Sequence, residues 1–173
     1  MFVGQLTEVE KSRANKILIV LHTSTSHGPS YNKKYPANFE KFKPVCNSVE
    51  LKDCNQQELI NAYDNIIVYT DYILHSLIDT LNAMKDYKSA MLFVSDHGES
   101  LGEKNLYMHG IPISLAPKEQ YEIPFLVWTS SNANKTLKPE KLLTQNYVFH
   151  SVLNFLDVNS PIYNEKLNIF IDR

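Results

Sequence analysis

The sequence predicts an α/β protein in which helices pack against a sheet, and three observations support this. Residues 91–94 and 123–129 are short apolar runs that suit buried strands and are too short for helices. Residues 16–22 are almost continuously apolar, as is typical of a strand buried on both faces of a parallel sheet. Apolar residues from Leu59 to Met84 recur at helical spacing. This order of strand, long helix and further strands is that of α/β layers.

The long helix is the best defined of the expected elements. Asn55, with Glu58 three residues later, resembles a capping box at its start. A helix of about 28 residues rises roughly 42 Å, at 1.5 Å per residue. Shorter amphipathic helices are expected at residues 2–13 and 142–156, a polar loop at 130–139 and an edge strand at 167–171.

Composition excludes several classes of function. The chain of 173 residues has a net charge of −2 and is 43% hydrophobic, as expected of one globular domain with a substantial core. It has no basic stripe to neutralise phosphates, so nucleic acid is not an expected partner. No apolar run reaches the ~18 residues of a membrane span. Residues 1–10 lack the basic start and apolar stretch of a signal peptide, which by itself predicts a cytoplasmic protein.

The two cysteines favour a different compartment. Cys46 and Cys54 lie in one polar segment and can close a disulfide, which would require oxidising surroundings. Two unrelated thiols are the alternative. A zinc site built on this pair alone is not expected, because no further Cys or suitably spaced His lies nearby.

The first candidate site follows the apolar run at 91–94. Asp96 and His97 come directly after it, where open α/β sheets place their ligands. A carboxylate oxygen next to an imidazole nitrogen suits a divalent metal such as zinc. The alternative is an Asp that caps a helix beside a surface His. A second histidine, His109, follows after a polar loop and favours a metal or phosphate site.

The second candidate site follows the run at 16–22. It contains Ser26, His27, Gly28 and Pro29, which offer hydroxyl and imidazole groups to a phosphate or metal. A solvated turn rich in Ser and Thr is the alternative. Both loops follow presumed parallel strands, so we expect their histidines and Asp96 to meet at one sheet edge. His75 lies within the pattern of the long helix and is interpreted as structural.

Together these segments resemble the phosphoethanolamine transferases of Gram-negative inner membranes, in the alkaline phosphatase and sulfatase superfamily. The resemblance covers residues 17–129 densely. The matching segments are Ser26-His27-Gly28-Pro29 with Tyr31 and Tyr35-Pro36, Cys46 and Cys54, residues 58–65 and 69–71, residues 95–103, Tyr107-Met108-His109-Gly110, and the strand at Pro124.

The resemblance implies a fold, a location and a set of site residues. The fold would be an alkaline phosphatase-like sandwich, with a central, mostly parallel sheet flanked by helices. Residues 1–173 would form the C-terminal portion of a periplasmic catalytic domain that other segments anchor in the inner membrane. Asp96 and His97 match the pair that ligates the catalytic Zn²⁺, and His27 and His109 match histidines that bind phosphate or a second metal. Cys46 and Cys54 match a periplasmic disulfide of the family.

The implied reaction has two steps. An activated threonine takes phosphoethanolamine from phosphatidylethanolamine and passes it to an acceptor such as lipid A. In the family, that threonine, the first zinc carboxylate and the membrane helices all precede the portion that this sequence matches. Thr23 and Thr25 do not match the nucleophile's motif, so the chain alone is expected to be inactive. The alternatives are a non-catalytic remnant, a subunit of a split enzyme, or another phosphotransferase or hydrolase of the superfamily.

Overall fold

The computed structural model describes residues 14–24, 26–139 and 142–172. These residues fall into two compact units. The first, here called the site unit, comprises residues 21–76 and 95–123. The second, called the sheet unit, comprises residues 14–20, 77–94 and 124–172 as far as they are described. The helix expected at residues 2–13 lies outside the described residues.

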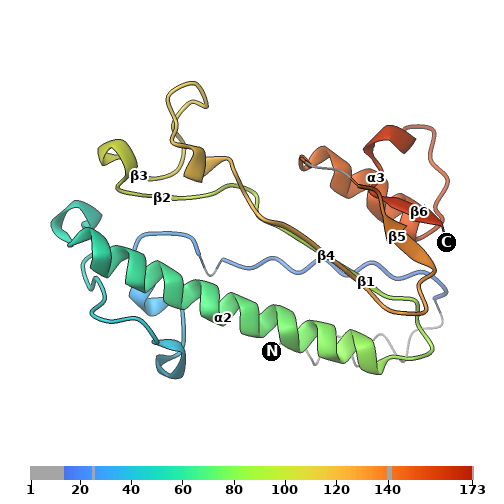
Figure 1. Cartoon of the computed structure of the whole chain (residues 1–173), viewed down its shortest axis with the longest axis horizontal. Helices are drawn as coiled ribbons and strands as arrows, with labels where there is room; N and C mark the ends of the chain where they lie inside the picture. The colour runs from blue at the N-terminus through green and yellow to red at the C-terminus, as the bar shows by residue number, and fades with distance from the viewer. Residues whose placement is uncertain (1–13, 25, 140–141, 173) are drawn as a thin grey trace. The chain divides into compact units, whose positions relative to one another are not determined.

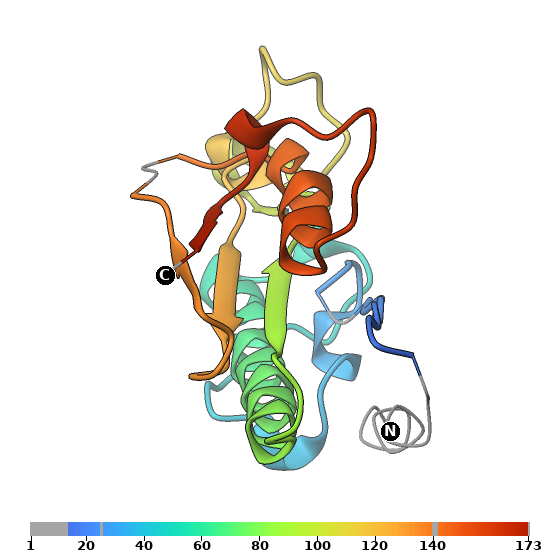
Figure 2. The ribbon, with the colours of Figure 1, turned by 90° about the vertical axis from the view of Figure 1, so that its right-hand side faces the viewer.

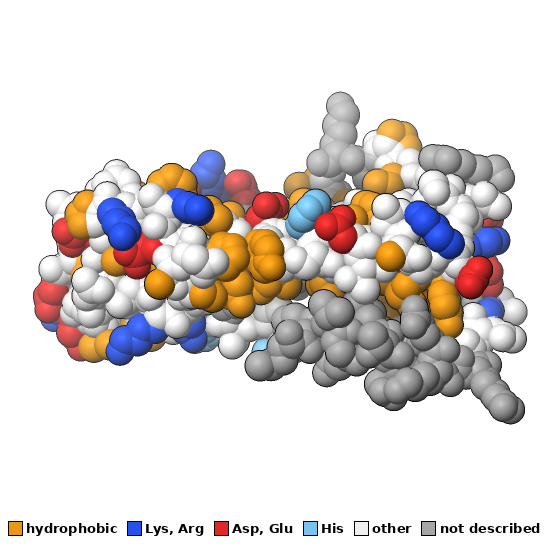
Figure 3. All heavy atoms as spheres, turned by 90° about the horizontal axis from the view of Figure 1, so that it is seen from below, with side chains coloured by type: hydrophobic (Ala, Val, Ile, Leu, Met, Phe, Trp, Pro, Cys, Tyr) orange, Lys and Arg blue, Asp and Glu red, His pale blue; other side chains and the backbone are white. Residues whose placement is uncertain are grey.

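The long helix is confirmed as α2, Gln56–Ala83 (Figure 1). The Asn55 side chain caps it, because its Oδ1 accepts the backbone N–H of Gln57 at 2.8 Å. Hydrophobic side chains gather along part of the face seen in Figure 3, and the exposed hydrophobic residues of α2 include Ile67 and Tyr72. None of the helices in the described part of the chain combines the length and hydropathy that a membrane crossing needs.

The segment before α2 is hydrogen-bonded to the helix through its backbone. It contains three 3₁₀ turns, η1 (Tyr31–Lys33), η2 (Ala37–Phe39) and η3 (Leu51–Asp53). The backbone N–H of Cys46 donates to the carbonyl of Glu58 in α2 at 3.0 Å. Residues of this segment, of α2 and of β2 together form the core of the site unit, which consists of Tyr31, Tyr35, Cys46, Leu51, Leu59, Ala62, Ile66 and Leu101.

A short hairpin follows the Asp96 loop. Strand β2 (Ser100–Leu101) pairs antiparallel with β3 (Tyr107–Met108), around the turn η4 (Glu103–Asn105). Gly102 begins the turn with φ 114°, a left-handed conformation that favours glycine. The sequence predicted a polar loop here, and two-residue strands are too short to show an alternating pattern. The hairpin returns the chain so that His109 follows β3 directly.

The sheet unit contains the two strands predicted after the long helix. β1 (Ala90–Val94) and β4 (Phe125–Thr129) pair antiparallel, with Ala90 opposite Thr129 and Val94 opposite Phe125 (Figures 1 and 2). Pro124 precedes the first paired residue of β4, so its missing N–H costs no ladder bond. All three strand pairs within the described residues are antiparallel, so the parallel pairing expected from the sequence is absent among them.

The C-terminal part of the sheet unit is a second small α/β layer. β5 (Lys135–Leu137) pairs antiparallel with β6 (Phe170–Asp172), next to α3 (Asn146–Phe155) and η6 (Glu165–Leu167). The helix is therefore shorter than the 142–156 expected, β5 occupies a predicted loop, and β6 lies slightly after the predicted edge strand.

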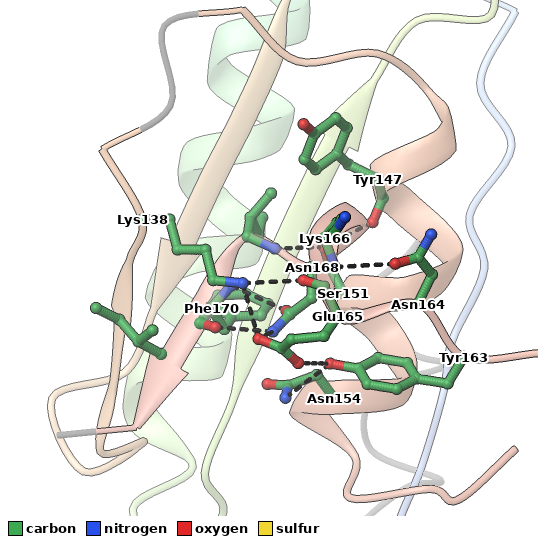
Figure 4. A network of polar contacts seen from close by, with 12 residues as sticks. Lys138, Tyr147, Ser151, Asn154, Tyr163, Asn164, Glu165, Lys166, Asn168 and Phe170 are labelled. Carbon is green, nitrogen blue, oxygen red and sulfur yellow. Dashed lines mark hydrogen bonds and ion pairs between the residues drawn. The ribbon is translucent and has the colours of Figure 1, made fainter.

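A polar network holds this C-terminal layer together (Figure 4). The buried Ser151 hydroxyl donates to the carbonyl of Tyr147 at 2.6 Å and accepts the N–H of Ile169 at 3.1 Å. Asn168, fully buried, bonds both the N–H and the C=O of Phe170 through its side chain. Because every strand here is only a few residues long, side-chain amides and hydroxyls provide the backbone partners that a larger sheet would supply.

The strand predicted at residues 16–22 is not formed. These residues make no strand ladder with any described segment, and Leu18 and Val20 are 59% and 80% exposed. An apolar, β-prone run becomes a strand only where a neighbouring edge accepts its backbone hydrogen bonds, and the described residues offer it none. The apolar pattern thus indicates a preference for burial that is not satisfied among the described residues.

Candidate metal centre

Three histidines meet in the site unit. His27 comes from the loop before η1, His97 from the loop after β1, and His109 from the end of β3. Their nearest ligand nitrogens all lie within 4.8 Å of one another. The rings of His97 and His109 stack with centroids 3.7 Å apart, and the ring of His27 meets His109 edge-on at 5.0 Å. The structure thus brings together histidines from two distant parts of the sequence.

Each imidazole is oriented through its Nδ1 atom. His27 and His97 place Nδ1 at 2.7 and 3.0 Å from the carbonyl of the glycine that follows each of them. His109 places Nδ1 at 3.2 Å from Oε1 of Glu99. Because carbonyl and carboxylate oxygens accept hydrogen bonds, these contacts require the proton on Nδ1, and Nε2 of a neutral ring then keeps its lone pair. Three lone pairs in one small volume suit a cation.

Asp96 lies at the exposed side of this cluster. Its Oδ2 is 3.8 Å from Nε2 of His97, and its side chain is 81% exposed. The carboxylate borders an open cavity of ≈ 90 Å³ in the site unit. The cavity is lined by His22, Thr23, Ser24, Ser26, His27, Tyr63, Ser95, Asp96, His97 and Glu99. A phosphate-sized group therefore has space next to the imidazoles.

Glu99 is the buried member of the site. Its side chain is 3% exposed, and Oε1 accepts both the Gly28 N–H and the His109 Nδ1–H at 3.2 Å. Its other oxygen, Oε2, accepts the hydroxyl of Tyr31. Burial, then the hydrogen bond and charge of Glu99, raise the pKa of Tyr31 far above its usual range. Burial and then the charge of Glu99 raise the pKa of Tyr63 as well. Both tyrosines therefore stay neutral, and Tyr31 remains a hydrogen-bond donor to Glu99.

The donor set fits a divalent metal such as zinc. Zinc binds imidazole at ~2.0–2.1 Å, so neighbouring donors of a tetrahedral ion are roughly 3.3 Å apart. The separations here, up to 4.8 Å among the histidines and 3.8 Å from Asp96 to His97, need only small side-chain adjustments. Imidazole with one carboxylate suits zinc and also other first-row metals, so the chemistry defines a metal centre more firmly than it defines the ion.

Among the described residues, the others singled out from the sequence do not belong to the histidine cluster. Cys46 and Cys54 form a disulfide with Cα atoms 5.7 Å apart, in the segment that packs on α2. His75 is exposed on α2. Thr23 lines the cavity, and Thr25 lies outside the described residues. Sequence reasoning did not assign roles to Glu99 and Tyr31, although both stand in the motifs that carried the resemblance.

The fold and the histidine cluster agree with a family assignment. The Sulfatase family profile matches residues 2–158, and the chain belongs to this family. The α/β, sulfatase-like fold class predicted from the sequence is thereby confirmed.

Within that family, the similar proteins are phosphoethanolamine transferases, as the sequence predicted. The chain is 45% identical to the phosphoethanolamine transferase EptA of Helicobacter pylori, over 95% of this chain and 33% of that protein. It is 42% identical to the phosphatidylethanolamine transferase Mcr-2 of Escherichia coli, over 92% of this chain and 30% of that protein. The chain therefore spans about a third of the length of these curated relatives.

Solved structures show the same likeness. The C-terminal periplasmic domain of the phosphoethanolamine transferase EptC from Campylobacter jejuni superposes with a TM-score of 0.86 at 38% identity. The match covers 96% of this chain and 55% of that domain. The soluble domain of lipooligosaccharide phosphoethanolamine transferase A from Neisseria meningitidis gives a TM-score of 0.90 at 31% identity, over 99% of this chain and 55% of that domain.

Proposed function

We propose that residues 1–173 form the C-terminal portion of the catalytic domain of a zinc-dependent phosphoethanolamine transferase. The donor would be phosphatidylethanolamine and the acceptor lipid A or another envelope lipid, in the periplasm of a membrane-anchored enzyme. The observation that carries this proposal is the convergence of His27, His97 and His109 next to Asp96. The similarity to named transferases supports the substrate class.

The four side chains divide into two pairs of roles. Asp96 and His97 would hold the catalytic zinc, because a carboxylate oxygen and Nε2 already approach each other at the open side of the cluster. His27 and His109 bind either a second metal or the phosphate of phosphoethanolamine. Their Nδ1 contacts favour the metal, since the remaining Nε2 of a neutral ring has a lone pair and no proton to donate.

The reaction places distinct demands on these residues. Bound zinc supplies a Lewis acid that activates a hydroxyl and offsets phosphoryl charge. His27 is exposed beside the cavity, so when protonated it can donate to a phosphate oxygen or to a leaving alkoxide. Asp96 and His97 line the same cavity from the loop after β1, so zinc held by them would lie beside the phosphate.

The covalent step needs a nucleophile outside this set. The family's reaction passes through a phosphorylated threonine, and neither Thr23 nor Thr25 matches that threonine's motif. We therefore propose that residues 1–173 bind zinc but do not transfer phosphoethanolamine without further segments. A remnant or a subunit of a split enzyme would share this behaviour, and both would differ from a complete transferase in the turnover assay below.

Zinc titration of the purified chain tests the metal centre. Isothermal titration calorimetry should give one or two zinc ions per chain, with affinity at least 10-fold weaker in Asp96→Ala and His97→Ala. His75→Ala is the matched control, since it removes an exposed histidine away from the cluster. Equal affinity in all variants would contradict the proposed site.

Turnover is measured separately. The zinc-loaded chain is incubated with fluorescent phosphatidylethanolamine, and we expect no release of diacylglycerol. Metal-dependent release that Asp96→Ala abolishes would overturn the proposed inactivity and would make Thr23 and Thr25 candidate nucleophiles.

A further inference from the structure

We propose that Glu99 is the positioning residue of the metal centre, because it fixes the tautomer of His109 and ties the His27 loop to the hairpin. Glu99 stands between these two loops and is buried, whereas the three histidines and Asp96 have partly or fully exposed side chains. Glu99 itself does not belong to the group of candidate ligands.

The contacts of Glu99 involve both loops that carry the histidines. Oε1 accepts from the Gly28 amide, next to His27, and from Nδ1 of His109, both at 3.2 Å. Oε2 accepts from Tyr31 at the start of η1. Gly28 and Tyr31 lie more than 60 positions before Glu99 in the sequence, and His109 lies 10 positions after it. One carboxylate therefore sets the distance between the two loops.

Space around the carboxylate is tight on the Gly28 side. A Cβ at Gly28 would lie 2.6 Å from the Tyr31 hydroxyl oxygen and 3.1 Å from Oε2 of Glu99. Only glycine lets the backbone amide approach so closely without displacing these groups. The close approach of Gly28 is thus part of the same arrangement as the Glu99 contacts.

The contact with His109 has a chemical consequence. A buried carboxylate that accepts from Nδ1 holds the proton on that nitrogen and leaves the Nε2 lone pair available to a metal. Without Glu99, the ring would be free to carry its proton on Nε2 and to turn away from His27 and His97. Outer partners of this kind typically contribute about 10–100-fold to metal affinity. This inference rests on the proposed metal centre, but the tautomer itself is a property of the metal-free chain.

The first test measures that tautomer without metal. Long-range ¹H–¹⁵N correlation spectra of the ¹⁵N-histidine-labelled chain, at a pH where the imidazoles are neutral, identify which nitrogen of His109 carries the proton. We expect Nδ1–H in the wild type, in Glu103→Ala and in Glu99→Gln, which retains an acceptor oxygen. Glu99→Ala should lose this preference. Glu103→Ala is the matched control, because Glu103 accepts the Leu101 N–H in the same hairpin.

The outcome is decisive even if Glu99→Ala fails to fold. An Nε2–H tautomer of His109 in the wild type, or an Nδ1–H tautomer that persists in folded Glu99→Ala, would overturn the proposal. Neither result depends on whether the centre binds zinc, so failure of this inference is distinguishable from failure of the proposed function.

The second test is zinc affinity by competition with a chromogenic chelator. We expect Glu99→Ala to weaken binding about 10–100-fold and Glu99→Gln to restore most of it. If Glu99 only stabilised the fold, Glu99→Ala would lower the unfolding midpoint, and Glu99→Gln would not restore the zinc affinity. Affinity in Glu99→Ala equal to that of Glu103→Ala would contradict a positioning role.

Discussion

Replacing Asn65 with alanine should destabilise the site unit more than most single polar substitutions. Asn65 is fully buried in α2, and its side chain makes four hydrogen bonds. Oδ1 accepts the N–H groups of Lys41 and Phe42 at 2.7 and 2.9 Å. Nδ2 donates to the Phe42 carbonyl at 3.0 Å and to the Tyr35 hydroxyl at 3.2 Å. The side chain thus replaces the backbone partners that this non-helical segment lacks.

The magnitude follows from these contacts. Each hydrogen bond contributes about 0.5–1.5 kcal/mol net, and the full set about 2–6 kcal/mol. Lys41 and Phe42 are exposed residues, so water can recover part of the loss at their amides. We therefore expect Asn65→Ala to lower the free energy of unfolding by about 2–4 kcal/mol, a large part of the ~5–15 kcal/mol typical of a domain.

Urea unfolding and amide hydrogen exchange measure this effect globally and locally. Protection of the Lys41 and Phe42 amides should fall sharply in Asn65→Ala. Asn47→Ala is the control, because Asn47 is an exposed asparagine of the same segment whose two side-chain hydrogen bonds can be replaced by water, so its loss should cost less than about 1 kcal/mol. Equal stability of the two variants, with unchanged protection at Lys41 and Phe42, would refute the reasoning.

Two further predictions concern the disulfide and the C-terminal layer. Reducing the Cys46–Cys54 disulfide, or replacing both cysteines by serine, should lower the free energy of unfolding by about 2–3 kcal/mol, because the bond closes a short loop. Equal urea midpoints of the oxidised and the reduced chain would contradict this prediction. Hydrogen bonds from Lys138 and Tyr163 lower the pKa of Glu165 from 4.5 to about 2. The stability that the ionised Glu165 contributes is therefore complete above pH 4.5 and is lost as the pH falls towards 2. In acid titrations monitored by circular dichroism, the wild type should lose more stability across this window than Glu165→Gln does.

Local sequence patterns predicted the helix and the strands whose own residues carry a clear periodicity or apolar run. The helical spacing after Asn55 specifies α2 from its own segment, and the two apolar runs became β1 and β4 because each run supplies the other's partner edge. The run at residues 16–22 failed because a strand also needs a partner edge, and a one-dimensional pattern does not show whether the chain supplies one.

The candidate site was predicted only in part, because a local pattern shows single residues but not the contacts between distant ones. The histidines and Asp96 can be recognised in the sequence by their chemistry. Their convergence was expected from two parallel strands, and the three histidines do meet, but among the described residues no parallel pair and no strand at 16–22 brings them together. Glu99 and Tyr31 act through a buried contact between residues 68 positions apart, which no local pattern shows. The β2–β3 hairpin depends on the left-handed turn at Gly102, and short pairs of this kind have no periodicity.

The central claim is that His27, His97 and His109, together with Asp96, form a metal centre. X-ray absorption at the zinc edge, measured on the chain with one equivalent of Zn²⁺, tests it most directly. We predict imidazole nitrogen and carboxylate oxygen donors at about 2.0–2.2 Å, with imidazole scattering reduced in His97→Ala. A spectrum of hydrated zinc without imidazole scattering, or a sulfur shell near ~2.3 Å, would contradict the account.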